Sequence, residues 1–150
     1  MAEVLFYHMT QSPLEVTLPM LLAKTRARGW RALVRGRDPA QVTALETRLW
    51  AQQHDATFLP LGPDGDQEDI LLCSDQSAEN NAEVAFLIDR TDIDVAEVQR
   101  RQRVCLLFDG NDETSLDHAR AQWKTVTDQG VAAVYWAQGP TGWQEKMRRD

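Results

Sequence analysis

Apolar and polar residues follow one another along this chain in blocks that predict strands and helices in turn. The clearest block is the unbroken apolar run at residues 104–108, which is typical of a strand buried on both faces of a sheet. A turn cluster, residues 109–112, follows it. Helical periodicity then continues to Gln129, with Asp112 placed to cap the helix and Gly130 placed to end it.

The rest of the chain repeats this order of strand and helix. Short apolar runs rich in β-favouring residues predict strands at residues 3–7, 30–34, 57–59, 69–73, 85–88 and 131–137. One helix is expected to begin with Ser12 as its cap and Pro13 in its first turn, and to end at Gly29. Pro19 should kink this helix or delay its start.

Three further segments have weaker patterns. A second helix is expected to start at residues 36–39 and to end near Trp50. A short helix is expected somewhere in the charged stretch 89–103. The tail at residues 139–150 is expected to hold Trp143 as an anchor before a basic end that frays.

A β-α-β-α order implies parallel strand pairs with right-handed crossovers. We therefore expect residues 1–150 to form one α/β domain, a mostly parallel sheet with helices on its faces, since 150 residues is the usual size of a single domain. No repeat, linker or low-complexity segment interrupts the pattern.

Charge and composition narrow the possible partners. The chain has 16 Lys and Arg against 23 Asp and Glu, a net charge of −7, which argues against broad binding to a nucleic-acid backbone. Strong direct binding to nucleic acid is therefore not expected. No apolar run approaches the roughly 18 residues of a membrane span, and the first residues lack a basic signal-peptide start, so we expect a cytoplasmic protein with no membrane partner. Cys73 and Cys105 lie in apolar runs and are interpreted as reduced core residues.

Most motifs for ligand chemistry are missing from the sequence. It contains neither GxGxxG nor GxxxxGK[ST], and the first strand–helix junction has no glycine, which weakens a nucleotide-binding role. No cofactor is therefore expected. His8, His54 and His118 are far apart and no CxxC is present, so each histidine is interpreted as a surface or capping residue and not as a metal ligand.

One catalytic alternative remains open. Asp109 and Asp112 follow a buried strand at its carboxyl end, where α/β enzymes place functional groups. Together with an acid such as Asp69 they would suit Mg²⁺ in a hydrolase or nuclease. The other interpretation is that they are ordinary turn and capping residues.

The helix after Asp112 carries the second candidate site. At about 100° per residue, Ala119 and Val126 share the stripe that should face the sheet. Side chains at the edge of that stripe and just beyond it form a mixed apolar and basic rim: Leu116, Arg120, Trp123, Lys124 and Thr127. This rim is either a core tryptophan beside a solvated basic edge or a small pocket for an acidic peptide that carries an aromatic residue.

An ordered set of segments resembles one known family over nearly the whole chain. The segments are VLFY at 4–7, GWRALV at 29–34, residues 45–50, TFLP at 57–60, DILL at 69–72, and the ARxxWK helix at 119–124 with its Gly130. Their order and spacing are similar to those of the chi subunit of the bacterial DNA polymerase III holoenzyme. No single segment is specific, and the resemblance rests on the set.

The resemblance implies a Rossmann-like three-layer fold and a replication accessory protein without catalytic activity. Chi proteins bind the acidic C-terminal tail of the single-stranded-DNA-binding protein, and many pair with the psi subunit and so reach the clamp loader. Their tail site uses basic residues and an aromatic on the last long helix, a pattern that Arg120, Trp123 and Lys124 match, with Trp where many members have Tyr. Two positions depart from the family pattern: Leu116 replaces a lysine of some relatives, and Leu61 replaces a histidine.

Overall fold

The structure, a computed structural model, describes residues 2–51, 61–62, 69–75 and 79–149. The expected strand at 57–59 and His54 lie outside these residues. The described elements, in chain order, are β1 (Glu3–Met9), α1 (Leu14–Ala27), β2 (Ala32–Arg35), α2 (Pro39–Ala51), β3 (Leu61–Gly62), β4 (Ile70–Cys73), β5 (Val84–Leu87), α3 (Val95–Arg100), β6 (Arg103–Asp109), α4 (Glu113–Asp128), β7 (Ala133–Gly139) and β8 (Gly142–Arg149).

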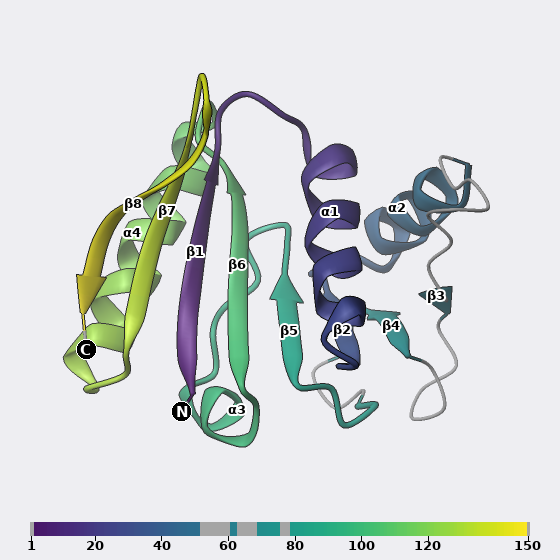
Figure 1. The fold of residues 1–150 in the computed structure, drawn as a ribbon, viewed down its shortest axis with the longest axis horizontal. Coiled ribbons are helices and arrows are strands. Elements are labelled where there is room, and N and C mark those ends of the chain that lie inside the picture. The colour runs from purple at the N-terminus through teal and green to yellow at the C-terminus, as the bar shows by residue number, and fades with distance from the viewer. Residues whose placement is uncertain (1, 52–60, 63–68, 76–78, 150) are drawn as a thin grey trace.

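The described strands form one sheet in the order β3-β4-β2-β5-β6-β1-β7-β8 (Figure 1). Neighbouring strands pair in parallel except at the β7–β8 edge, where the pair is antiparallel. The mostly parallel α/β fold predicted from the sequence is therefore confirmed. β1 pairs with both β6 and β7, so the N-terminal strand lies deep in the sheet.

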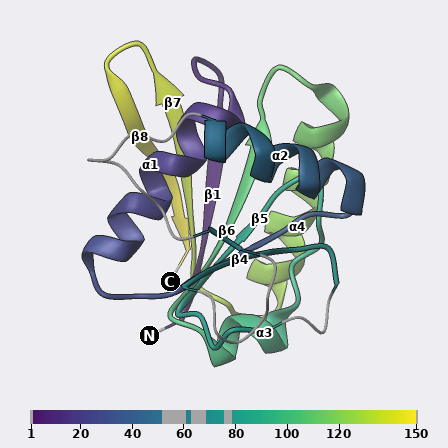
Figure 2. The same ribbon diagram turned by 90° about the vertical axis from the view of Figure 1, so that its right-hand side faces the viewer.

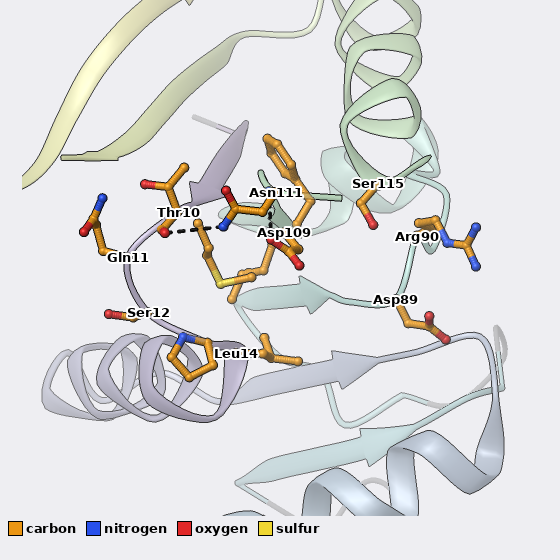
Figure 3. Close-up of a pocket in the computed structure, with 13 residues that line it drawn as sticks. Thr10, Gln11, Ser12, Leu14, Asp89, Arg90, Asp109, Asn111 and Ser115 are labelled. Carbon is orange, nitrogen blue, oxygen red and sulfur yellow. Dashed lines mark hydrogen bonds between the residues drawn. The ribbon is translucent and has the colours of Figure 1, made fainter. Parts of the chain in front are cut away.

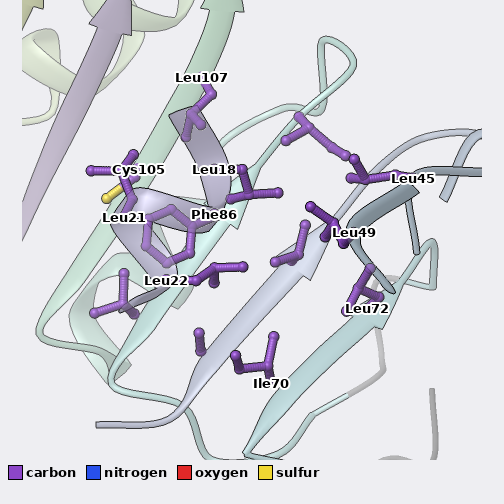
Figure 4. Close-up of a cluster of buried hydrophobic side chains, with 14 of the residues drawn as sticks. Leu18, Leu21, Leu22, Leu45, Leu49, Ile70, Leu72, Phe86, Cys105 and Leu107 are labelled. Atoms are coloured by element: carbon purple, nitrogen blue, oxygen red, sulfur yellow. The ribbon is translucent and has the colours of Figure 1, made fainter. Parts of the chain in front are cut away.

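Helices cover both faces of the sheet, and Figure 2 shows α1 on one side of the strands and α4 on the other. Strand side chains alternate between the two sides because successive residues of a strand point to opposite faces. Leu5 and Met9 of β1 belong to the core beneath α1 and α2, while Val4 and Phe6 belong to the core beneath α3 and α4. Figure 4 shows the first core, where leucines of α1 and α2 pack onto the central strands.

The structure corrects three details of the predicted elements. Pro13, rather than Ser12, is the N-cap of α1. α1 begins at Leu14 and continues through Pro19, so the proline does not delay its start, and buried positions on both sides of Pro19 hold the helix against the sheet. The tail is a regular strand, β8, and Trp143 packs edge-on against Tyr7 with ring centroids 5.3 Å apart, which confirms its expected role as an anchor.

A buried ion network lies between β2 and α3. The Glu97 carboxylate accepts hydrogen bonds from Arg35 Nη1 at 2.8 and 3.0 Å and from Arg101 Nη2 at 2.7 Å. The side chains of Glu97, Arg35 and Arg101 are only 2–3% exposed. The charged stretch 89–103 therefore contributes to the protein interior as well as to its surface.

The two cysteines are free, and a bond between them is not feasible. Cys73 lies on β4 and Cys105 on β6, with β2 and β5 between them. Adjacent strands are about 4.8 Å apart, so three spacings exceed the reach of a disulfide. Burial raises the pKa of the Cys105 thiol to about 12, which keeps it protonated.

Serine at the two cysteine positions should have unequal effects on stability. Cys105 is 1% exposed, so Cys105→Ser places a hydroxyl in an apolar core and should lower the free energy of unfolding by about 1–2 kcal/mol. Cys73 is half-buried and donates to the Val34 carbonyl, a bond that serine can keep, so Cys73→Ser should have a smaller effect. Urea denaturation measures both changes, and equal losses would contradict the different burial. Neither change should alter partner binding in folded protein.

None of the helices in the described part of the chain has the length and apolar character needed to cross a membrane.

Candidate functional site

α4 begins and ends where the sequence predicts. Asp112 holds the N-cap position, and its carboxylate accepts a hydrogen bond from the Ser115 hydroxyl at 2.7 Å. This bond lowers the pKa of Asp112. At the other end Gly130 adopts a φ of +77°, the left-handed conformation that glycine takes most readily.

The predicted stripe of α4 faces the sheet. Ala119 and Val126 are completely buried, which confirms the periodicity argument. Trp123, half-buried at the edge of the stripe, packs edge-on against Phe6 at 5.3 Å and against Tyr135 at 6.0 Å between ring centroids. Leu116 is also half-buried and packs against the same core.

The polar members of the rim differ in what they can offer a ligand. The Arg120 side chain is 67% exposed, and its ion pair with Asp117 is long, at 3.5 Å. Lys124 is exposed. The Thr127 hydroxyl donates to the Trp123 carbonyl at 2.8 Å, so its donor is already used within the helix. The rim therefore presents two exposed cations beside a tryptophan edge.

Two residues beside this rim were not predicted from the sequence as part of a site. His8 Nδ1 lies 2.7 Å from the Tyr135 hydroxyl oxygen. β1 and β7 pair in parallel, with Phe6 opposite Tyr135, which brings residues more than 120 positions apart into contact. Burial lowers the pKa of His8, and the Arg120 charge lowers it further. Burial raises the pKa of Tyr135, and the Arg120 charge opposes that rise. The Arg120 charge therefore acts on both members of the pair.

β8 adds a further apolar side chain. Met147 lies directly across from Tyr135 in the β7–β8 register and is 52% exposed. Cross-strand partners share a face of the sheet, so Met147 extends the surface beside Tyr135 away from α4. We name the set Leu116, Arg120, Trp123, Lys124, Thr127, His8, Tyr135 and Met147 the α4 surface.

The three aspartates considered as Mg²⁺ ligands do not lie together in the structure. Asp109 ends β6 and Asp112 caps α4, but Asp69 precedes β4 and therefore lies at the opposite edge of the parallel sheet. Asp69 binds Arg26 at 3.2 Å and Arg31 at 3.5 Å. Asp109 accepts the amide of Asn111 at 2.9 Å, as a turn residue does.

No group of three potential metal ligands occurs within the described residues. His8 contacts Tyr135, and His118 lies 2.8 Å from Asp92, so these two histidines have separate surroundings.

A cavity of about 460 Å³ lies elsewhere, at the carboxyl ends of the central strands (Figure 3). Here α1 and α4 leave the sheet toward opposite faces, the usual ligand position of open α/β sheets. However, the backbone N–H groups of the β1–α1 turn already have an acceptor. The amides of Thr10, Gln11 and Ser12 all donate hydrogen bonds to Gln138 Oε1, at 2.9–3.2 Å. The turn that would hold a phosphate in a nucleotide-binding relative is thus already occupied.

Comparison with known proteins agrees with the resemblance seen in the sequence. The family model described as DNA polymerase III chi subunit, HolC, matches residues 1–134. No curated protein sequence matches the chain significantly.

Proposed function

Since the chain belongs to the family of DNA polymerase III chi subunits, we propose that it is a non-catalytic accessory subunit that binds the acidic C-terminal tail of the single-stranded-DNA-binding protein. In this role it links that protein to the clamp loader, through a psi subunit or another clamp-loader component. The proposal treats residues 1–150 as one chi-like domain that acts in the cytoplasm.

The observation that carries the proposal is the combination of charge and apolar surface on α4. Arg120 and Lys124 are exposed cations in a chain of net charge −7, and they flank the half-buried Trp123. A peptide that ends in an acidic, aromatic segment needs a cation for its carboxylates and an apolar edge for its ring. Both are present within one turn of helix.

Leu116 makes the α4 surface less basic and more apolar than in relatives that have a lysine at this position. Where some relatives have a lysine, this chain has a half-buried leucine that packs against the core. The surface therefore has a thinner basic rim and a larger apolar part, which Met147 of β8 extends. We expect binding to depend less on salt than it would with a third cation.

Isothermal titration with a synthetic acidic peptide that ends in phenylalanine tests the proposal. Saturable binding in the micromolar range is expected, because a short peptide buries a small area and must become ordered on binding. A scrambled peptide of the same composition is the control. Failure of the unmodified protein to distinguish the two peptides would exclude this function for the α4 surface.

Binding of single-stranded DNA by the protein alone should be weak. The net charge of −7 opposes the approach of a phosphate backbone, and three of the arginines, Arg26, Arg31 and Arg103, each pair with an acid. Fluorescence anisotropy with a labelled oligonucleotide near physiological salt measures this. Sub-micromolar affinity in the absence of the single-stranded-DNA-binding protein would contradict the expectation.

A further inference from the structure

His8 is held in one orientation beside the α4 surface. Its ring packs between Phe108, at 5.2 Å, and Tyr135, at 5.8 Å between centroids. Gly110 closes the ring's remaining edge so tightly that a Cβ at this position would lie 1.9 Å from His8 Nε2. The close approach requires glycine at position 110, and it fixes Nδ1 toward the Tyr135 hydroxyl.

Tyr135 borders the part of α4 that carries Arg120, because its ring packs against Trp123, which lies one helical turn from Arg120. Tyr135 is half-buried, with Trp123 on one side and the Met147 position on the other. Within the described residues, the hydroxyl has a hydrogen bond to His8 only. A hydroxyl has one proton to donate and two lone pairs to accept with, so one further bond is available to a ligand.

We propose that the Tyr135 hydroxyl, oriented by His8, donates a hydrogen bond to the terminal carboxylate of the bound peptide while Arg120 provides the countercharge. This inference rests on the proposed function and names the residue that recognises a free chain end. Tyr135 contacts the ligand, and His8 is a positioning residue that acts through Tyr135.

The direction of the His8 bond decides whether Tyr135 can donate. If the His8 proton is on Nε2, Nδ1 accepts the tyrosine proton, and the hydroxyl turns its lone pairs toward the ligand. If the proton is on Nδ1, it is donated to the Tyr135 oxygen, and the tyrosine proton is free for the carboxylate. A bound carboxylate favours the second arrangement, because a negative charge stabilises the donor that faces it.

A comparison of two peptides isolates this hydrogen bond. One peptide is acidic and ends in a phenylalanine with a free carboxylate, and the other has the same sequence with a C-terminal amide. The unmodified protein should prefer the free acid. Tyr135→Phe should weaken binding of the free acid roughly tenfold, the loss expected for a bond to a charged group, and should leave binding of the amide unchanged.

Tyr7→Phe is the matched control. Tyr7 is also half-buried. Because it is adjacent to His8 in β1, its side chain points to the other face of the sheet, where it packs against Trp143. Its phenol should not affect either peptide. Melting curves for both tyrosine variants show whether each remains folded.

Variants of His8 test the orienting role separately. His8→Ala should reproduce the loss seen with Tyr135→Phe. His8→Asn places an amide donor near the position of Nδ1 and should recover much of the affinity for the free acid, which a merely structural contribution of the ring would not explain.

The outcomes distinguish the two proposals. Unchanged binding of the free acid by Tyr135→Phe, together with weaker binding by Arg120→Ala, would overturn the role of Tyr135 and leave the α4 surface as the tail site. If the unmodified protein binds neither peptide, the proposed function and this inference fail together.

Discussion

Replacing Glu97 with alanine is expected to lower the free energy of unfolding by about 3–5 kcal/mol, because Arg35 and Arg101 lose the buried carboxylate that they share, although Arg101 keeps its ion pair with Glu79 at 2.7 Å. Glu97 bonds both Arg35 and Arg101, and all three side chains are almost fully buried. Removing one member of such a network exposes the desolvation penalty of the charges that remain. Urea denaturation followed by circular dichroism measures the loss.

An exposed ion pair provides the matched control. Glu145 accepts from Arg148 at 2.7 Å, a distance equal to that between Glu97 and Arg101, but its side chain is 38% exposed. Glu145→Ala should change stability by less than about 0.5 kcal/mol, because water replaces the lost partner. If the two variants lose the same stability, burial does not determine the strength of these pairs.

The Glu97 network is separate from the proposed binding surface. Glu97 belongs to α3 and bonds residues of β2 and of the segment after α3, whereas the peptide-binding residues lie on α4, β1, β7 and β8. Glu97→Ala protein that remains folded should therefore bind the acidic peptide normally. This pattern would separate loss of stability from loss of function.

Sequence patterns correctly predicted the helices and strands that depend only on nearby residues. The run 104–108 is buried along its whole length in β6, since an apolar strand without alternation needs cover on both faces. Ala119 and Val126 are buried because they are spaced seven residues apart, two turns of one helix. The Arg120, Trp123 and Lys124 cluster follows from the same local geometry.

The contacts that complete the site depend on long-range register and could not be predicted in this way. His8 and Tyr135 meet only because β1 lies beside β7, and nothing in either segment indicates that pairing. The tail looked frayed because its charges suggest an exposed end, yet β7 provides hydrogen bonds along one side of β8. The short helix expected within residues 89–103 is present as α3, but its charges gave no sign that Glu97 and Arg101 would be buried together.

Replacing Arg120 with alanine should have the largest effect on binding of the acidic peptide. The guanidinium can bind a carboxylate with two parallel hydrogen bonds, and its loss should weaken binding by about 1.5–3 kcal/mol. Arg120→Lys should recover only part of this, because a point charge lacks the planar fork. Isothermal titration of each variant with the peptide gives the comparison.

Neighbouring charges on α4 provide controls for this measurement. Asp117 lies 3.5 Å from Arg120 and competes with a peptide carboxylate, so Asp117→Asn should leave binding unchanged or make it tighter. Lys124 is exposed, and Lys124→Ala should weaken binding by at most about 1 kcal/mol, an effect that should shrink as salt is added.

Trp123 needs a separate measurement, because its ring supports the fold as well as the surface. It packs against Phe6 and Tyr135, so Trp123→Ala should reduce both stability and peptide affinity, and circular dichroism with a melting curve must accompany its titration. The Arg120 and Lys124 variants give the decisive test, because both side chains are exposed and their loss should not affect folding. If Arg120→Ala and Lys124→Ala bind the peptide as tightly as the unmodified protein, α4 is only a core tryptophan beside a solvated basic edge, and the tail binds elsewhere.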